Sequence, residues 1–442
     1  MMYIGEMQSM KKTGVTIGLL VICSMISSCG KQSMSIRQKE EPVIIEISWW
    51  GEENRSRSTK QVCELYQKLH PNVEFKYSST SWDGYFDKLA TQAATGTMPD
   101  IIQMDYMYLK SYTQNGSLMD LTEYIEDGTI DVSGINQTFV KSGIVDEKYA
   151  GIVISETALS IGYNEELFWQ AGVEEPTADW TWEDFTDKCE TIASKTGKYG
   201  FMADFSTDMS FFRYWVRQHG YELFSEDNRS LAYEDDQICA GYFDMWKKLM
   251  NKQAMVDAEE STAYSRLKQE KNPIVTKDVA MILEWNNFAK KMSAYTDKIK
   301  MMTPPGAVSD EKPLWLKPGM FLSISETSEV KKEAAEFINW FLNSNEANEI
   351  LLGERGVPVA ASVRQHLIDS SLLGTTEREM FEGLDAAEKI CGETPPPEPL
   401  GMMEVTDAFQ NAGAKVYYGE VSALEAAKEF RQDAEEILQK NN

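Results

Sequence analysis

Histidine and positively charged residues are scarce in this chain, and both shortages exclude classes of function. The 442 residues contain only three histidines, His70, His219 and His366, which are widely spaced. A multi-histidine metal site or a histidine-based catalytic triad therefore has little to build on. Lysine and arginine total 43 against 70 aspartates and glutamates, which gives a net charge of -27. Nucleic acids, anionic membrane surfaces and strongly anionic ligands such as phosphorylated sugars are poor partners for such a chain.

Cysteine is also scarce, and catalytic sequence motifs are absent. Four cysteines follow position 29, and none belongs to a CxxC pair: Cys63, Cys189, Cys239 and Cys391. A chain of this size does not need disulfides, so four isolated thiols are favoured over a disulfide framework. The sequence contains no GxGxxG, Walker A, HExxH, GxSxG or EF-hand pattern. It therefore gives no support for an enzyme, and no cofactor or metal site is predicted.

A membrane-spanning run is missing too, but a shorter apolar stretch stands near the N-terminus. Residues 13–26 are mostly apolar and follow two lysines. They fall short of the ~20 residues of a membrane span. The stretch ends in Ile26-Ser27-Ser28-Cys29-Gly30, which resembles a bacterial lipobox. The resemblance predicts a signal peptide over 1–28 and acylation of Cys29, for example with palmitate. An ordinary secretory signal or an uncleaved anchor is the alternative.

The polar residues 29–41 after that signal predict a flexible tether. With Cys29 acylated, the tether would hold an acidic body at the outer face of the cell membrane through the lipid alone. Translation starts at Met1 or at Met10, which is followed directly by the two lysines.

The remainder of the chain can form packed cores, because 42% of the sequence is hydrophobic. Its first part alternates strand patterns over 43–50, 73–77 and 100–104 with amphipathic helix patterns over 55–70 and 82–94. This alternation predicts an α/β fold with a parallel sheet and helical crossovers. Ligands bind at the carboxyl ends of the strands in such sheets, where Trp49, Trp50, Asp105 and Tyr106 stand.

Further along, the pattern predicts an extended segment over 149–164 and then mostly helices. Thr181 fits the N-cap of a helix that ends at Thr196. Other predicted strands are 199–203, 278–285, 300–306 and 320–324, and other predicted helices are 165–171, 209–219, 235–252, 261–270, 329–342, 344–352, 403–417 and 422–439. The proline-rich run Thr394–Pro399 excludes a helix or a central strand and predicts a fixed extended loop.

Tryptophans lie beside small polar or charged residues at several predicted strand ends. The stronger cases are Trp49, Trp50, Trp82 and Trp285, and the weaker ones are Trp215 and Trp315. A sugar offers C–H groups on its ring faces and hydroxyls around its rim, which suit aromatic faces and polar side chains respectively. These residues predict a site for a neutral carbohydrate, with plain packing as the alternative. The other tryptophans are expected to be structural: Trp180 and Trp182 at a helix start, and Trp340 in a core.

Several segments, in order along the chain, resemble the extracellular solute-binding proteins of sugar ABC importers, the group that includes maltose-binding proteins. The segments are Trp49-Trp50-Gly51, Thr95–Ile101, Gly162–Gly172, Trp182–Phe185, Asp278–Met281, Glu333–Ile338, Gly356–Val359 and Ser422–Ala427. Residues 162–172 are similar to the family's YN..LF..AG pattern, and 182–185 to its W.EF pattern. The resemblance covers roughly 43–440, and a lipidated cysteine fits it, because Gram-positive members are commonly tethered in that way.

The resemblance implies a two-lobed α/β fold of the type II periplasmic-binding-protein kind, with the ligand cleft between the lobes. Lobe one would comprise 42–155 and 298–345, and lobe two would comprise 156–297 and 346–442. Closure around the ligand would be a hinge motion, and the closed form is what an importer reads.

The resemblance also implies which residues line the cleft. They are Trp49, Trp50, Glu52, Glu53, Trp82, Asp105, Glu156 or Thr157, Trp285, Asn286, Gly319, Met320 and the loop Pro399–Met403. The aromatic pattern adds Tyr85, Tyr106 and Trp215. Arg355 either bonds sugar hydroxyls or forms a salt bridge. Where maltose binders carry a stacking tryptophan, this chain has Met402 and Met403, which argues against a maltodextrin ligand.

These features together predict a lipid-anchored, monomeric binding protein that captures a neutral mono- or oligosaccharide and delivers it to ABC permease subunits. Polyols, glycerol phosphates and other small solutes are alternative ligands. A phosphate ligand calls for clustered arginines or lysines at the strand ends, where acids and tryptophans stand instead. A carbohydrate hydrolase and a surface adhesin without transport are the alternative classes of function. The identity, length and linkage of the sugar and the partner permease stay open.

Overall fold

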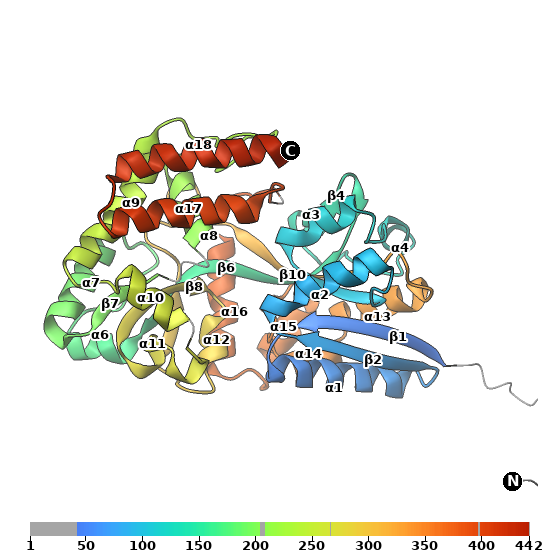
Figure 1. Ribbon diagram of the computed structural model, residues 1–442. Helices are drawn as coiled ribbons and strands as arrows, with labels where there is room; N and C mark the ends of the chain where they lie inside the picture. Colours follow the sequence, from blue (N-terminus) through green and yellow to red (C-terminus); the bar gives the residue numbers. More distant parts are fainter. Residues whose placement is uncertain (1–41, 204–207, 266, 397, 442) are drawn as a thin grey trace, which may run out of the picture. The chain divides into compact units, whose positions relative to one another are not determined.

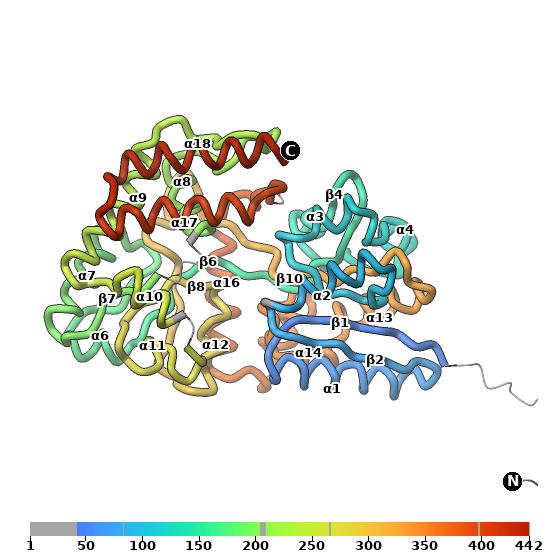
Figure 2. Tube along the Cα trace, viewed as in Figure 1, coloured from blue at the N-terminus to red at the C-terminus, as the bar shows by residue number. Residues whose placement is uncertain are grey.

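The computed structural model of the protein describes residues 42–441, apart from 204–207, 266 and 397. The predicted signal peptide, Cys29 and the tether lie outside the described residues. Residues Pro42–Asn442 group into one compact unit, which is traced in Figures 1 and 2. Within the described residues, no helix combines the length and the apolarity that crossing a membrane requires.

The first five elements confirm the predicted alternation of strands and helices. They are β1 (Val43–Trp50), α1 (Glu53–Leu69), β2 (Val73–Thr80), α2 (Trp82–Thr95) and β3 (Ile101–Met104). β1 pairs in parallel with β2 and with β3. Because the three strands are parallel, their carboxyl ends share one edge of the sheet. Trp50 ends β1 at that edge, and Asp105 directly follows β3 there.

The remaining strands extend the sheet in the order β2-β1-β3-β10-β6-β8-β7, and β9 and β11 also pair with β6. Their bounds are β6 Ile152–Asn164, β7 Tyr199–Met202, β8 Val279–Trp285, β9 Ile299–Met302, β10 Leu316–Ile324 and β11 Val357–Pro358; β4 (Ile144–Val145) and β5 (Lys148–Tyr149) form a separate hairpin. β10 runs antiparallel to β3 and to β6, so the whole sheet is mixed.

Strand β6 connects two parts of the sheet. All of its 13 residues are buried, which fits the nearly continuous apolar run in the sequence. Its first half pairs with β10, where Ala158 lies opposite Leu316. Its second half pairs with β8, where Leu159 lies opposite Trp285, and with β9. The pairing partners of β6 therefore change between Ala158 and Leu159.

Strand β10 begins earlier than the sequence pattern predicts, because it includes Pro318 and Gly319. Its register against β6 shifts between Pro318 and Met320, and again between Met320 and Phe321. Such an irregularity admits a proline and a glycine that a regular central strand would not. The longer strand carries Lys317 and Gly319 into the middle of the sheet.

Helices form most of the rest of the chain. They are α3 Tyr106–Gln114, α4 Thr122–Glu126, α5 Gln137–Ser142, α6 Glu165–Ala171, α7 Trp182–Thr196, α8 Asp208–Gln218, α9 Asp236–Asn251, α10 Ala258–Ser265, α11 Pro273–Thr276, α12 Phe288–Met292, α13 Lys331–Asn343, α14 Asn345–Leu351, α15 Ala361–Asp369, α16 Thr375–Glu388, α17 Met402–Tyr417 and α18 Ala423–Asn441, with a short 3-10 turn at Gln269–Lys271. α7 starts at the predicted cap, where Thr181 and Asp184 form a reciprocal capping box. The sequence pattern does not predict α3, α15 and α16, nor the short helices α4, α5, α11 and α12.

Contacts between elements group the later segments differently from the expected lobe ranges. α14 packs against α1, although 346–442 is expected in lobe two. β9 pairs with the same half of β6 as β8 does, although 298–345 is expected in lobe one. α17 and α18 lie side by side and pack against α9 (Figure 1). The lobe boundaries therefore stay a prediction. The contacts of α14 and β9 bear on where those boundaries lie.

The tryptophans and cysteines expected to be structural have structural surroundings. Trp180 Nε1 donates to the Thr303 carbonyl (2.9 Å), and Trp182 Nε1 donates to the side-chain oxygen of Gln218 (2.9 Å). Trp340 packs against the hydrophobic core. The four cysteines within the described residues are free thiols: Cys63, Cys189, Cys239 and Cys391.

Candidate ligand-binding site

An aromatic cluster lies at the carboxyl end of β1. The ring of Trp50 stands edge-on to Trp82 (5.1 Å between centroids) and to Tyr85 (5.4 Å). Trp50 and Tyr85 are buried, whereas 41% of Trp82 is exposed. The Tyr85 hydroxyl lies 2.9 Å from the Gln103 carbonyl and 3.1 Å from that of Ser48. Of these three rings, Trp82 is therefore the one most open to solvent, and the other two brace it.

Three other predicted residues surround this strand end. Trp49 is fully buried, and its Nε1 donates to Ser56 Oγ (3.3 Å). Glu52 and Glu53 are exposed at the start of α1. Negative charge is favourable at a helix N-terminus. Stabilisation of α1 therefore explains the two carboxylates without any contact with a ligand.

Strand β6 brings predicted residues of β6 and β8 next to β10. Thr157 lies opposite Lys317 of β10, and Leu159 lies opposite Trp285 of β8. The Lys317 ammonium group lies 4.7 Å from the centroid of the Trp285 ring, in a cation–π contact. Trp285 and Thr157, which are far apart in sequence, are therefore neighbours of the same β10 residue.

Asn286 follows Trp285 and is held by the backbone of β6. Its Oδ1 accepts from the Ala158 N–H (3.3 Å), and its own backbone N–H donates to the Ala158 carbonyl (2.9 Å). Its Nδ2 is buried and has no hydrogen-bond partner among the described residues. A buried polar group without a partner costs about 1–3 kcal/mol, so an acceptor on a ligand would be favoured there.

Gly319 and Met320 of β10 lie against Ser155 of β6. A Cβ atom at Gly319 would stand 2.6 Å from Ser155 Oγ and 3.2 Å from the Ser155 carbonyl oxygen, so a larger residue would force Ser155 to shift. Met320 pairs with Ser155 in the ladder and is buried. The two residues therefore lie where the register between the paired strands β10 and β6 shifts.

Glu156 is buried and already has a protein partner. Only 2% of the residue is exposed, and its Oε1 lies 2.8 Å from Arg364 Nη1. Burial raises the pKa of Glu156 to about 7, although the Arg364 charge opposes the rise. Arg364 also donates to the Pro358 carbonyl (3.2 Å). The carboxyl group therefore titrates close to neutral pH and ties β6 to α15.

Tyr106 joins the end of β3 to the proline-rich run. It begins α3 directly after Asp105, whose carboxylate accepts the Met107 N–H (2.9 Å) as an N-cap. Its ring stacks on Phe321 of β10, with 5.8 Å between centroids. Its hydroxyl donates to the Pro395 carbonyl (3.1 Å). Burial of the ring raises the pKa of Tyr106.

The proline loop, defined as residues 393–396 and 398–400, is neither helix nor strand, as the sequence predicts. Thr394 Oγ1 donates to the carbonyl of Leu316 at the start of β10 (2.9 Å). Glu398 accepts two hydrogen bonds from Arg213 of α8, 2.9 Å from Nη1 and 2.6 Å from Nη2. The loop is therefore fastened to β10 and to α8 as well as to the Tyr106 hydroxyl.

Sequence reasoning missed Arg213, Glu398 and Lys317. Arg213 and Arg217 lie four residues apart in a predicted helix, which puts them on the same helix face. That spacing was the available signal, but it does not identify a partner 185 positions away. Lys317 was missed because the strand pattern begins only at Met320.

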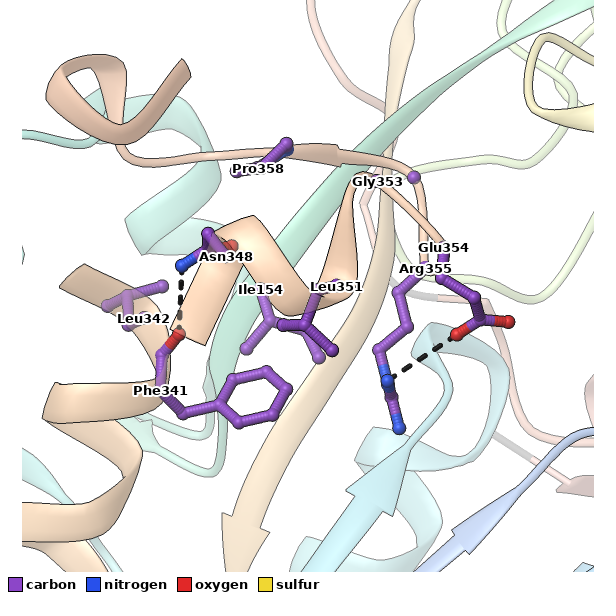
Figure 3. Close-up of a pocket in the computed structure, with 10 residues that line it drawn as sticks. Ile154, Phe341, Leu342, Asn348, Leu351, Gly353, Glu354, Arg355 and Pro358 are labelled. Carbon is purple, nitrogen blue, oxygen red and sulfur yellow. Dashed lines mark hydrogen bonds and ion pairs between the residues drawn. The ribbon is translucent and has the colours of Figure 1, made fainter. Parts of the chain in front are cut away.

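Arg355 is surrounded by protein groups and takes part in a salt bridge, one of its two expected roles. Its Nε donates to Gln103 Oε1 (3.0 Å) and its Nη2 to Thr59 Oγ1 (2.6 Å), while Nη1 lies 3.5 Å from Glu354 Oε2. Burial lowers the pKa of Arg355 to about 10. Arg355 and Glu354 line a cavity of about 20 Å³, and Figure 3 shows the two side chains linked to each other. A cavity of that size holds about one water molecule and is too small for a sugar.

Two further predicted site residues, Trp215 and Met403, lie on helices α8 and α17. Trp215 Nε1 donates to the Ile238 carbonyl (2.8 Å), and its ring stands edge-on to Trp182 (5.4 Å). Met403 is 51% exposed on α17. A groove of about 700 Å³ is lined by residues of α17, of α18 and of the turn between them, many of them charged, and none of the predicted site residues lines it. Contact of the predicted residues with a ligand stays a prediction.

The side chains around β10 combine an aromatic ring, an amide nitrogen without a partner among the described residues, a tyrosine hydroxyl and a lysine ammonium group. Within the part of the chain that the structure describes, no group of three or more His, Cys, Asp or Glu side chains is placed to hold a metal ion. Ring faces beside polar hydrogen-bonding groups suit a ligand with C–H faces and hydroxyls.

Comparison with known proteins gives a consistent result. A family model described as bacterial extracellular solute-binding protein matches residues 50–348. A putative binding protein of Brucella abortus (strain 2308) is 26% identical over 175 residues, which cover 39% of this chain and 41% of that protein. A putative ABC transporter periplasmic-binding protein of Escherichia coli (strain K12) is 22% identical over 199 residues, 42% of each chain. The alignments therefore span about two fifths of these curated relatives.

A solved structure matches over a much larger share. A periplasmic oligogalacturonide-binding protein of Yersinia enterocolitica, in complex with saturated digalacturonic acid, is 26% identical and superposes with a TM-score of 0.79. The match covers 90% of this chain and 99% of that chain. The similarity therefore extends over the whole fold and includes the elements around β10.

Proposed function

The chain belongs to the bacterial extracellular solute-binding proteins, and on that premise we propose that it captures a neutral mono- or oligosaccharide and delivers it to ABC permease subunits. Its fold is the two-lobed α/β fold of type II periplasmic solute-binding proteins. The description of the Escherichia coli relative supports delivery to an ABC transporter, and the ligand of the Yersinia neighbour supports a carbohydrate. In this proposal the protein is a monomer, and it binds the sugar without converting it chemically.

The observation that carries this proposal is the pair Trp285 and Asn286 at the end of β8. The indole ring provides an apolar face, and the buried Nδ2 of Asn286 lacks a partner among the described residues. A sugar ring placed on Trp285 would offer Nδ2 a hydroxyl oxygen as acceptor. Thr157 lies on the adjoining strand β6, Met320 lies on β10 beyond it, and the Tyr106 ring stacks on Phe321.

The proposal of a neutral ligand rests on charge pairing. Arg213, the arginine beside the proline loop, already binds the carboxylate of Glu398. Arg364 is likewise paired with Glu156. An acidic oligosaccharide is the second candidate, because the Lys317 ammonium group lies over Trp285 and because the Yersinia neighbour binds digalacturonic acid.

We propose that the lobes move about β6. In the expected lobe ranges the chain passes from lobe one to lobe two between residues 155 and 156. The change of pairing partners between Ala158 and Leu159 supports a hinge close to that position. β1, β2, β3 and β10 would then move with the first half of β6, and β7, β8 and β9 with the second half. Under this grouping the second crossing lies between Met302 and Leu316.

Lipid anchoring is a further part of the proposal, and Cys29→Ser tests it. The wild-type protein is expected to fractionate with membranes, because an acylated Cys29 would partition into the bilayer. The Cys29→Ser variant is expected in the medium or to keep its signal peptide. Ser27→Thr is the matched control, since it keeps the cysteine and a small residue before it. An unchanged membrane fraction for Cys29→Ser with the signal peptide removed would rule out a lipid anchor at this residue.

Ligand binding is tested by a thermal-shift screen of the protein against neutral mono- and oligosaccharides, with acidic sugars, amino acids and peptides included. A ligand that binds only the folded state adds about 2.7 kcal/mol of stability at a hundred times its Kd. We expect a clear shift with a neutral glycan, and at least a tenfold loss of its affinity in Trp285→Ala.

Trp169→Ala is the matched control for that screen, because Trp169 is 80% exposed on α6. Its affinity for the glycan should equal that of the wild type. A shift only with digalacturonate would favour the second candidate, and shifts only with amino acids or peptides would contradict a carbohydrate ligand.

A further inference from the structure

Arg213 and Glu398 form a closely fitted pair where α8 meets the proline loop. The two nitrogens at the end of the guanidinium group each bind one carboxylate oxygen, at 2.9 and 2.6 Å. Only 9% of the Arg213 side chain and 17% of the Glu398 side chain is exposed. This two-pronged geometry is the one in which arginine recognises carboxylates in general. Here the carboxylate belongs to the protein itself.

Among the described residues, the polar contact of the Arg213 guanidinium group is the one with Glu398. The ring of Phe224 lies 5.4 Å from the guanidinium carbon. Arg217, one turn further along α8, donates to the Glu393 carbonyl (3.0 Å) and lies 3.6 Å from the half-exposed Glu222. Two arginines with little solvent contact therefore face one loop, and the Glu398 carboxylate is the group that fits the Arg213 fork.

The pair lies close to a residue of the candidate site. Tyr106 binds Pro395 through its hydroxyl, and Pro395 belongs to the same loop as Glu398. The raised pKa of Tyr106 comes mainly from burial, while the Glu398 charge adds to it and the Arg213 charge opposes it. Both charges therefore act on the Tyr106 hydroxyl, which connects the pair to β10 through Phe321.

We propose that Glu398 is a specificity-determining residue: it fills the fork of Arg213 with an internal carboxylate and so excludes sugars that carry a carboxylate. The inference rests on the proposed function and deepens it, because it explains how an arginine near the site is compatible with a neutral ligand. A uronic acid would have to displace Glu398, which is tied to its loop and competes at a high effective concentration. A neutral sugar does not have to compete for Arg213.

Glu398→Ala tests this proposal, with affinities measured for digalacturonate and for the neutral glycan found in the screen. Removal of the internal carboxylate leaves the Arg213 fork open, so digalacturonate should bind at least tenfold more tightly than to the wild type. The gain should be confined to digalacturonate, with no gain in affinity for the neutral glycan. Sodium acetate should raise the thermal midpoint of Glu398→Ala above that in sodium chloride of equal ionic strength, because acetate refills the fork.

Asp236→Ala is the matched control, because Asp236 pairs with Arg431 at 2.6 Å and the two side chains are about equally buried, 20% and 19% exposed. It should lose stability without a gain in digalacturonate affinity. If Glu398→Ala does not fold, Glu398→Gln keeps the shape of the side chain, removes its charge and should give the same direction of change.

Digalacturonate binding to the wild type as tight as that of the neutral glycan would overturn the proposal. So would the absence of any gain in both Glu398 variants. A wild type that binds no glycan at all would contradict the proposed function, and the effect of Glu398→Ala on digalacturonate binding would still decide the role of Glu398.

Discussion

Replacement of Glu354 by alanine is expected to lower the free energy of unfolding by about 3–5 kcal/mol. Glu354 accepts from Arg55 Nε at 3.0 Å with each of its two oxygens and lies 3.5 Å from Arg355 Nη1. The side chains of Arg55 and Arg355 are 9% and 6% exposed. The variant would therefore leave two buried guanidinium groups without their carboxylate, which is more costly than the loss of a surface pair.

Urea unfolding of the variant and the wild type measures this effect. Glu336→Ala is the control, because its i,i+4 pair with Lys332 is 3.6 Å long and both side chains are about half exposed or more. That variant should change the free energy of unfolding by less than about 0.5 kcal/mol. A loss below about 1 kcal/mol for Glu354→Ala would contradict a stabilising role for this network, which holds the start of α1 against the turn after α14.

The second large effect concerns pH. Burial raises the pKa of Glu156 from the ordinary value of 4.5 to about 7. Between these values the folded protein holds a proton that the unfolded chain has released, so this group makes the free energy of unfolding fall as pH rises. A shift of that size corresponds to a loss of up to about 3 kcal/mol, complete above pH 7 and absent below pH 4.5.

Glu156→Gln should abolish this part of the pH dependence. The amide oxygen can still accept from Arg364, but the side chain no longer ionises. Urea unfolding at pH 4.5 and pH 8 should therefore show a smaller loss for Glu156→Gln than for the wild type. Glu326→Gln, at an exposed carboxylate paired with Lys331, should follow the wild type. Equal losses in wild type and Glu156→Gln would mean that Glu156 is already ionised at low pH.

Local features of the fold were predictable because neighbouring residues determine them. The capping box at Thr181 follows from a hydroxyl and a carboxylate three positions apart, so the start of α7 was predicted correctly. The alternation of β1, α1, β2, α2 and β3 follows from residue periodicity. α16 was missed, although Met380, Phe381, Leu384 and Ala387 form a buried helical stripe. Its pattern is interrupted by a glycine and by many charged residues.

Features that depend on distant partners were not predictable. Pro318 and Gly319 argue against a strand, yet β10 includes them through a shift in its register with β6. The antiparallel direction of β10 depends on the route of the chain and leaves no trace in the strand's own residues. Arg213 and Glu398 meet across 185 positions. The aromatic residues at the strand ends were found from sequence, but Lys317 beside Trp285 required the strand pairing.

A calorimetric titration of the protein with the neutral glycan from the screen tests the central claim most directly. The account predicts a saturable 1:1 isotherm that returns to baseline after each injection, with the affinity reduced at least tenfold in Trp285→Ala. The absence of a binding signal with any neutral glycan would contradict the account. Heat that continues after each injection would contradict it as well, because it would indicate turnover of the sugar instead of its capture.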